Sequence, residues 1–106
     1  MKNNKTYTGR ISGILKAFPG VEVLVNDIPL KHHIRHSHTG IQWGYEGSGP
    51  ADLARSILMD YFEGNTQEAE KYYYRFKVCF VSAWEQEWEI TSEDIDRWMA
   101  EEIIVA

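Results

Sequence analysis

The stretch Gly40-Ile41-Gln42-Trp43-Gly44-Tyr45-Glu46-Gly47-Ser48-Gly49-Pro50-Ala51-Asp52-Leu53 passes from an aromatic segment through a glycine-rich loop into the start of a helix. Glycine adopts backbone angles that other residues avoid, so this spacing of glycines predicts a tight loop. Pro50 is suited to the first helical position, with Gly49 as N-cap and Asp52 near the positive helix end. The sequence therefore predicts a helix that begins at Pro50.

The residues that follow have a helical pattern. Apolar residues recur at spacings of three and four, which predicts one buried face formed by Leu53, Ile57, Leu58, Tyr61 and Phe62. Gly64 is typical of a helix end, and Asn65 with Glu68 matches the capping box that begins another helix.

The second helix is expected to follow Asn65 and to continue to Ala83, because its apolar stripe runs from Ala69 to Ala83 with no turn residue inside it; Val78–Val81 could instead form a strand. Its buried residues would be Tyr72, Tyr73, Phe76, Cys79, Phe80 and Ala83, with Lys71, Arg75 and Lys77 pointing outward.

Extended segments are predicted on both sides of these helices. Thr6–Ile11 and Val21–Val25 have the bias of strands and form an antiparallel hairpin, and Ile41–Trp43 could add a short strand. Glu87–Ile90 alternates as a short extended piece, followed by a helix from Ser92 to about Glu102. Thr91 with Asp94 caps that helix, which buries Ile95, Trp98, Met99 and Ile103. The expected fold is a single α+β domain over residues 1–106, in which the hairpin packs on about three helices.

Composition narrows the class of protein. The chain has 106 residues, 43% hydrophobic and 25% charged, which is typical of one globular domain. Cys79 is the single cysteine, which excludes an internal disulfide and favours an intracellular protein. No apolar run is long enough to span a membrane, and no signal peptide is predicted. We expect a cytoplasmic protein.

The net charge of −5 is unevenly distributed. Residues 1–62 carry seven Lys/Arg and five Asp/Glu, a balance of +2, whereas residues 63–106 carry four and eleven, a balance of −7. An acidic second half disfavours direct nucleic-acid binding and favours a basic protein partner. The alternative is a solvated helix face.

The glycine-rich loop is the first candidate site. Its members are His36, Trp43, Tyr45, Gly47, Ser48, Gly49 and Asp52. A glycine loop that leads into a helix can bind an anion or a small ligand through free backbone N–H groups. The sequence lacks the Gly-Lys-Ser/Thr of a phosphate loop, and Glu46 and Asp52 would repel a phosphate. The alternative is that the glycines only permit a tight turn.

Metal and catalytic groups are sparse. His32, His33, His36 and His38 are close in sequence, and Asp27 or Glu46 could complete a metal site, yet no cysteine pair supports one. Ser48 does not lie in a Gly-x-Ser-x-Gly elbow, and a dyad with His36 has no support. Cys79 falls on the apolar stripe and is expected to be buried. We assign no metal, no cofactor and no catalytic residue.

A partner surface is the second candidate. Tyr74 is expected to point away from the core, and Trp84 and Trp88 are further candidates for exposed anchors. They lie close in sequence to acidic residues, Glu85, Glu87 and Glu89. Aromatic anchors beside charged groups suit a protein–protein contact. The alternative is that the tryptophans cover the ends of the core.

The pattern His-Ser-x-Thr-Gly-x-x-Trp-Gly-Tyr-x-Gly-Ser-Gly-Pro-Ala-Asp-Leu, which begins at His36, resembles a small domain family of unknown function found in bacteria, phages and plasmids. The resemblance extends to Thr6-Tyr7-Thr8-Gly9, to Tyr73 with Phe76-Lys77, and to Trp88, Ile90-Thr91 and Ile95. The chain departs from it at His38, where the family has proline, at Glu46, where it has glycine, and in a longer connection at Ser12–Gly20. The resemblance implies a phage or mobile-element context and supplies no activity.

These observations predict a non-enzymatic protein-interaction module of a phage or mobile element. Such a module could inhibit a host nucleic-acid-processing or defence complex. The alternative is a small-ligand or anion-binding module that uses the glycine-rich loop.

Overall fold

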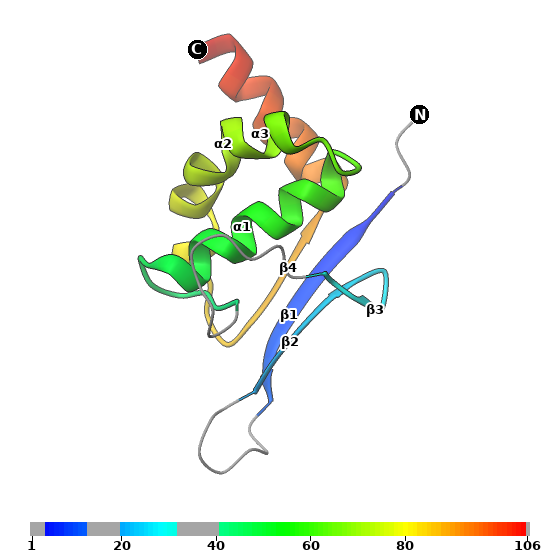
Figure 1. The fold of residues 1–106 in the computed structure, drawn as a ribbon, viewed down its shortest axis with the longest axis vertical. Coiled ribbons are helices and arrows are strands. Elements are labelled where there is room, and N and C mark those ends of the chain that lie inside the picture. Colours follow the sequence, from blue (N-terminus) through cyan, green and yellow to red (C-terminus); the bar gives the residue numbers. More distant parts are fainter. Residues whose placement is uncertain (1–3, 13–19, 32–40, 106) are drawn as a thin grey trace.

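The computed structural model describes residues 4–12, 20–31 and 41–105, with side chains to residue 101 (Figure 1). The elements are β1 Thr6–Ser12, β2 Gly20–Val25, β3 Ile28–Pro29, α1 Ser48–Tyr61, α2 Thr66–Cys79, the 3₁₀ turn η1 Val81–Ala83, β4 Glu87–Thr91 and α3 Ser92–Val105. The predicted α+β architecture is confirmed: a sheet that contains the N-terminal hairpin packs on three helices.

The sheet has four antiparallel strands in the order β3-β2-β1-β4. Thr8 of β1 lies opposite Leu24 of β2 on one side and opposite Glu89 of β4 on the other. Side chains alternate between the two faces. The face that packs on the helices carries the buried residues Tyr7, Val23, Trp88 and Ile90. The opposite face carries Thr8, Arg10, Glu22, Leu24, Glu87 and Glu89, and Figure 1 shows the helices only on the first face.

The hairpin and the last strand were both predicted, but β3 was not. Asn26 and Asp27 turn the chain after β2 with φ angles of 49° and 67°, as their tolerance of the left-handed region allows. Two residues then pair back on β2, Leu24 with Pro29 and Val25 with Ile28. A two-residue strand has no periodicity that a sequence pattern could reveal.

Helix α1 is the centre of the molecule. Leu53, Ile57 and Leu58 have no exposed surface, and most of the helix is buried. The helix begins at Ser48 with Gly47 as N-cap, two residues before the predicted start at Pro50. The Ala51 N–H donates to the Gly47 carbonyl at 3.1 Å, so the chain is helical before the proline. Proline is tolerated inside a first turn, because its missing N–H has no intrahelical partner there.

Helix α2 begins where predicted, because the Asn65 side chain accepts from the Glu68 N–H at 3.2 Å. It ends at Cys79, so the prediction of a helix to Ala83 is wrong. The chain leaves the α-helix at Phe80 and tightens into η1, which changes the direction of the following side chains. Ala83 is therefore exposed rather than buried, and Cys79, the last residue of α2, is also exposed, so both predictions of burial are wrong.

Lys77 is buried although the helical pattern predicts it outward. Only 8% of the residue is exposed, and its Nζ lies 3.1 Å from Glu46 Oε1 and 4.6 Å from the centre of the Tyr74 ring. A carboxylate and an aromatic face compensate the charge of this ammonium group as it leaves water. Lys77 is buried because Glu46 and the rest of the glycine-rich loop pack over this part of α2.

Helix α3 continues directly from β4 and begins with the predicted cap. The Thr91 N–H donates to Asp94 Oδ2 at 3.0 Å, and the Asp94 N–H donates to Thr91 Oγ1 at 3.1 Å. These reciprocal bonds satisfy two N–H groups at the helix start. The buried positions Ile95, Trp98 and Met99 are those expected; the side chain of Ile103 lies outside the described residues.

Candidate functional site

The glycine-rich loop is held against η1 and the residues after it. Gly44 has a φ of +86°, its N–H donates to the Val81 carbonyl at 3.0 Å, and a Cβ there would lie 2.9 Å from the Trp84 carbonyl oxygen. The indole N–H of Trp43 donates to the Glu85 carbonyl at 2.6 Å. Trp43 therefore joins the core instead of the predicted strand, since Ile41–Trp43 has no regular structure.

The glycines at the start of α1 are explained by packing. A Cβ on Gly47 would lie 2.8 Å from Cε2 of the Tyr45 ring. A Cβ on Gly49 would lie 2.8 Å from the Gln42 Cβ and 3.0 Å from the Tyr45 hydroxyl. Such distances are too short for a side chain, so the glycines give the Tyr45 ring room to cover the helix start. This supports the structural interpretation of the loop.

The other predicted loop residues do not form a cluster of exposed polar groups. Asp52 and Trp43 are buried, Ser48 is exposed at the first position of α1, and Glu46 is paired with Lys77. His32, His33, His36 and His38 lie outside the described residues. In the part of the chain that is described, no group of three His, Cys, Asp or Glu side chains could hold a metal ion.

Strand β4 is the edge of the sheet, and its outer backbone groups can be identified from the register. The Ile11 N–H donates to the Gln86 carbonyl, and the Ser92 N–H donates to the Lys5 carbonyl. In an antiparallel ladder the hydrogen-bonded pairs alternate, so the residues of β4 that bond to β1 are Trp88 and Ile90. The N–H and C=O groups of Glu87 and Glu89 therefore point away from β1.

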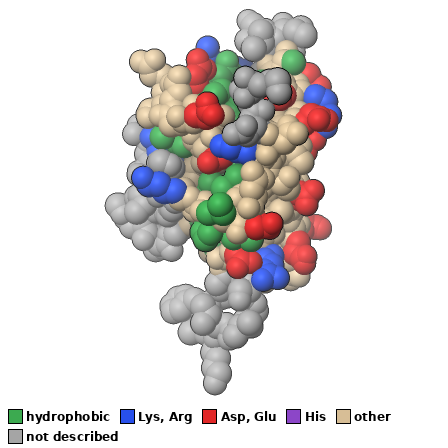
Figure 2. Space-filling view, turned by 90° about the vertical axis from the view of Figure 1, so that its right-hand side faces the viewer, with side chains coloured by type: hydrophobic (Ala, Val, Ile, Leu, Met, Phe, Trp, Pro, Cys, Tyr) green, Lys and Arg blue, Asp and Glu red, His purple; other side chains and the backbone are tan. Residues whose placement is uncertain are grey.

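No strand among the described residues covers this outer edge. The side chains of Glu87 and Glu89 are exposed on the open face of the sheet, and Glu85 is exposed just before them. Figure 2 shows acidic side chains along the right-hand margin of the molecule, where β4 and α3 lie. An edge that is short and acidic does not pair readily with its own copies.

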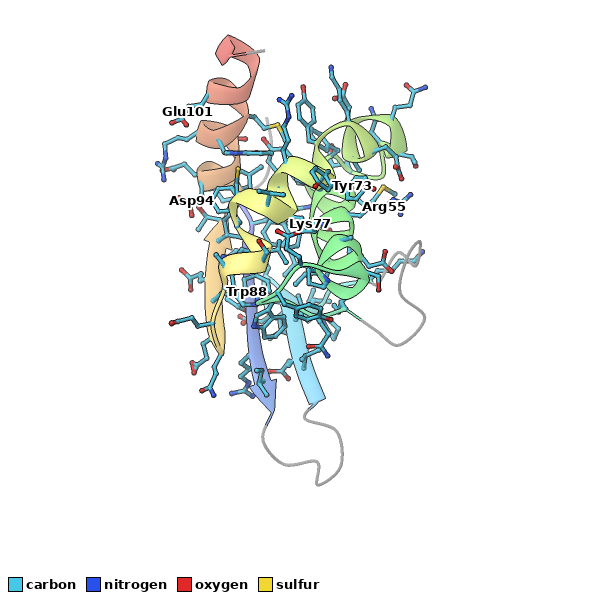
Figure 3. The ribbon with its side chains drawn as sticks, turned by 90° about the vertical axis from the view of Figure 1, so that its left-hand side faces the viewer. Arg55, Tyr73, Lys77, Trp88, Asp94 and Glu101 are labelled. Carbon is cyan, nitrogen blue, oxygen red and sulfur yellow. The ribbon has the colours of Figure 1, made fainter. Side chains whose placement is uncertain are left out.

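A groove of about 320 Å³ runs beside this edge. It is lined by Phe80 and Trp84 from the segment after α2, by Glu89 and Ile90 from β4, and by Asp94, Arg97, Trp98 and Glu101 from α3. Asp94 and Glu101 are seven residues apart, about two helical turns, and Figure 3 shows both on the outer side of α3. We call this groove, defined by these eight residues, the β4–α3 groove.

Aromatic rings form the floor of the groove. The Phe80 and Trp98 rings meet edge to face with their centres 5.8 Å apart. The Trp84 ring stacks on Trp88 at 3.9 Å, with 12° between the planes. Trp88 is only 8% exposed, so it supports Trp84 from below and is not the exposed anchor that the sequence suggested. Trp84 is half-buried and lines the groove.

The rim of the groove is acidic. It carries two carboxylates, Asp94 and Glu101, and one guanidinium, Arg97, whereas the side chain of the lining residue Glu89 lies on the open face of the sheet. Arg97 donates to Glu93 at 3.1 Å and also to Asp94. Hydrogen bonds from the Thr91 backbone N–H and hydroxyl, with the nearby Arg97, lower the pKa of Asp94, so this carboxylate is ionised at neutral pH.

Tyr74, the other predicted anchor, is 60% exposed but lies on α2 beside the Glu46–Lys77 pair. It is not among the residues that line the groove. The structure therefore places Trp84 and Glu89 along one groove and Glu87 on the open face of the same strand, and it leaves Tyr74 on a separate part of the surface.

Two buried tyrosines, Tyr7 and Tyr61, form partly buried hydrogen bonds to carboxylates that do not line the groove. The Tyr7 hydroxyl donates to Asp60 Oδ2 at 2.8 Å, and the same oxygen lies 3.0 Å from Lys5 Nζ. The Tyr61 hydroxyl donates to Asp96. Burial, and then these bonds, raise the pKa of both tyrosines above the ordinary value. Both hydroxyls therefore stay protonated at neutral pH.

Sequence reasoning did not find the residues from α3 that complete the groove. Trp98 was assigned to the core and Asp94 to a helix cap, and both assignments are correct. Glu101 was given no role. The spacing of residues 94, 98 and 101 along the predicted helix could have indicated the groove, because residues four and seven positions apart share one face of a helix.

The comparisons with known proteins give a family and no activity. Residues 7–101 match a family described as a family of unknown function (DUF6166). No curated protein and no solved structure matches the chain. None of the helices in the described ranges has the length and apolar character needed to cross a bilayer.

Proposed function

This chain belongs to that family of unknown function, and we propose that it is a non-enzymatic protein-binding module that captures an extended, basic segment of a partner along the outer edge of β4. The observation that carries this proposal is the row of outward N–H and C=O groups at Glu87 and Glu89, together with their exposed carboxylates. Such an edge accepts an additional strand through main-chain hydrogen bonds.

Charge complementarity supports a basic partner. In a strand added to this edge, residues opposite Glu87 and Glu89 lie on the same open face as the two carboxylates. Lysine or arginine at those positions forms opposite-charge cross-strand pairs, each contributing roughly 0.2–1 kcal/mol. The net charge of −5 also attracts a basic segment over a longer range.

A second copy of the chain is a poor occupant of the same edge. Pairing β4 with β4 would bring Glu87 and Glu89 of one copy close to the same residues of the other. Like charges in neighbouring strands are destabilising. The edge therefore selects against self-association and for a partner of opposite charge.

The phage or mobile-element setting suggested by the sequence pattern gives this binding a biological use. Basic extended segments bind nucleic acid by neutralising phosphates with lysine and arginine. A protein that occupies such a segment through carboxylates competes with nucleic acid for it. We propose that the chain inhibits a nucleic-acid-processing or defence complex of the host in this way.

The proposal is tested with a fluorescein-labelled decapeptide of alternating lysine and threonine. Fluorescence anisotropy should show saturable binding at low salt that weakens as salt is raised, because exposed charge pairs are screened. A peptide with the same sequence but with N-methyl groups on alternate residues along one edge cannot donate to β4. It should bind about tenfold more weakly or worse, since several main-chain hydrogen bonds are lost.

Two variants separate the edge from general charge. Glu87→Lys/Glu89→Lys should weaken binding of the decapeptide by about tenfold, because attraction is replaced by repulsion. The matched control is Glu63→Lys/Glu93→Lys, which changes the net charge equally at exposed positions outside β4. Equal losses in the two double variants, or equal binding of the N-methylated peptide, would overturn the proposal.

A further inference from the structure

We propose that the β4–α3 groove is a specificity pocket for one long cationic side chain, lysine or arginine, of the segment bound along β4. This inference rests on the proposed function and adds the class of side chain that is recognised. The occupant enters the groove from the added strand, on the face of the sheet opposite to Glu87 and Glu89.

Strand geometry brings a side chain of the partner to the groove. Successive side chains of a strand point to opposite faces of the sheet. In the partner strand, the residues directly opposite Glu87 and Glu89 point to the open face, and their neighbours along that strand point toward the helices. On β4 itself this direction is that of Trp88 and Ile90, both buried. Glu89 and Ile90 line the groove, so the edge of β4 is also one of its walls.

The lining of the groove has two parts that match the two parts of a lysine or arginine side chain. The rings of Phe80, Trp84 and Trp98 offer apolar surface and π faces to the aliphatic stem and the cationic head. The carboxylates of Asp94 and Glu101 lie farther out, on the outer side of α3 (Figure 3). An anionic side chain would meet the carboxylates of Asp94 and Glu101 against the one guanidinium of Arg97, so the groove selects against it.

Arg97 pairs with Asp94 at the rim and leaves Glu101 without an ion pair to it. Its guanidinium donates to Glu93 and Asp94, two residues of its own helix. No ion pair joins Glu101 to any charged side chain in the part of the chain that the structure describes. Glu101 is therefore the carboxylate that a cationic head group in the groove would meet without displacing an existing pair.

The test uses three versions of the lysine–threonine decapeptide, in which the central threonine is replaced by lysine, by arginine or by norleucine. Norleucine keeps the aliphatic stem and removes the charge. The lysine and arginine peptides should bind about five- to tenfold more tightly than the norleucine peptide. The Glu101→Gln variant should remove most of this difference and leave the affinity for the norleucine peptide unchanged.

Matched variants keep the result interpretable. Glu63→Gln changes an exposed carboxylate that neither lines the groove nor pairs with Arg97, and it should preserve the preference for a cationic residue. Phe80→Leu keeps apolar surface and removes one π face, and it should reduce the preference by about twofold. If the lysine and norleucine peptides bind with equal affinity, or if Glu101→Gln weakens both equally, this inference is wrong while strand addition stands. If none of the peptides binds, the proposed function itself fails.

Discussion

The indole of Trp88 lies against the backbone of Gly9, the residue directly opposite it on β1. A Cβ at position 9 would lie 2.3 Å from Cε2 and 2.4 Å from Nε1 of that ring. The same ring stacks on Trp84 and meets Trp43 edge to face with centres 5.6 Å apart. The missing side chain at position 9 thus allows the tryptophan cluster to lie on the sheet.

Gly9→Ala should destabilise the protein by about 1–3 kcal/mol, because the added methyl group forces Trp88 out of its position. Urea denaturation followed by tryptophan fluorescence measures the effect. Thr8→Ala, on the open face of the same strand, is the control and should change the free energy of unfolding by about 0.5 kcal/mol or less. In a protein that already carries Trp88→Leu there is room for a methyl group at position 9, so Gly9→Ala should lower the free energy of unfolding by less. An equal loss with and without Trp88→Leu would contradict this explanation.

Glu46→Gln should lower the free energy of unfolding by about 1 kcal/mol, because it leaves the ammonium group of Lys77 without its carboxylate. Lys77→Met should cost less than Glu46→Gln, since methionine fills the same space without a charge that needs a partner. Both are measured by urea denaturation at low salt. Glu63→Gln on the α1–α2 turn is the control, and a Lys77→Met variant less stable than Glu46→Gln would oppose this account.

The cap of α3 should make stability depend on acidic pH. The pKa of Asp94 is lower in the folded protein than in the unfolded chain, so its contribution is present above the unfolded pKa of about 3.9 and is lost as pH falls through the folded value. Urea midpoints measured from pH 6 down to pH 2.5 should therefore fall less steeply in Asp94→Asn than in the parent protein. Glu93→Gln serves for comparison, and identical acid profiles for Asp94→Asn and the parent would refute the prediction.

Alkaline pH should unfold the protein through its buried tyrosines. Folding raises the pKa of Tyr7 and Tyr61, so their contribution is complete below the unfolded pKa of about 10 and is lost as pH rises above it. Absorbance at 295 nm should show that some of the six tyrosines ionise only together with unfolding. Tyr7→Phe/Tyr61→Phe should remove this late phase, whereas Tyr74→Phe, at an exposed position, should remove part of the early phase.

Local patterns were sufficient for most of the fold. The capping pairs Asn65–Glu68 and Thr91–Asp94 each mark a helix start that the structure confirms. The alternation at Glu87–Ile90 marks β4, although the pattern does not reveal that β1 is its neighbour. These features depend on residues within a few positions of each other, and a sequence shows such relationships directly.

The features that were missed depend on contacts between distant segments. Lys77 lies on the polar side of its own helix and is buried because the loop carrying Glu46 packs over it. Trp43 looks like part of a strand, but its N–H bonds to a carbonyl 42 residues away. The groove was missed for the same reason, because it combines residues after α2 with residues of β4 and α3.

The position of β4 beside β1 also has a consequence for synthesis on the ribosome. The hairpin of β1 and β2 emerges early, but the strand that covers the other side of β1 follows some 80 residues later, as the pair Thr6–Thr91 shows. At typical elongation rates the nascent chain exposes that side of β1 for about 4–16 s. Through this interval β1 is an uncovered edge strand, and unlike β4 it has no acidic side chain. A chaperone at the tunnel exit would bind the nascent chain at this edge.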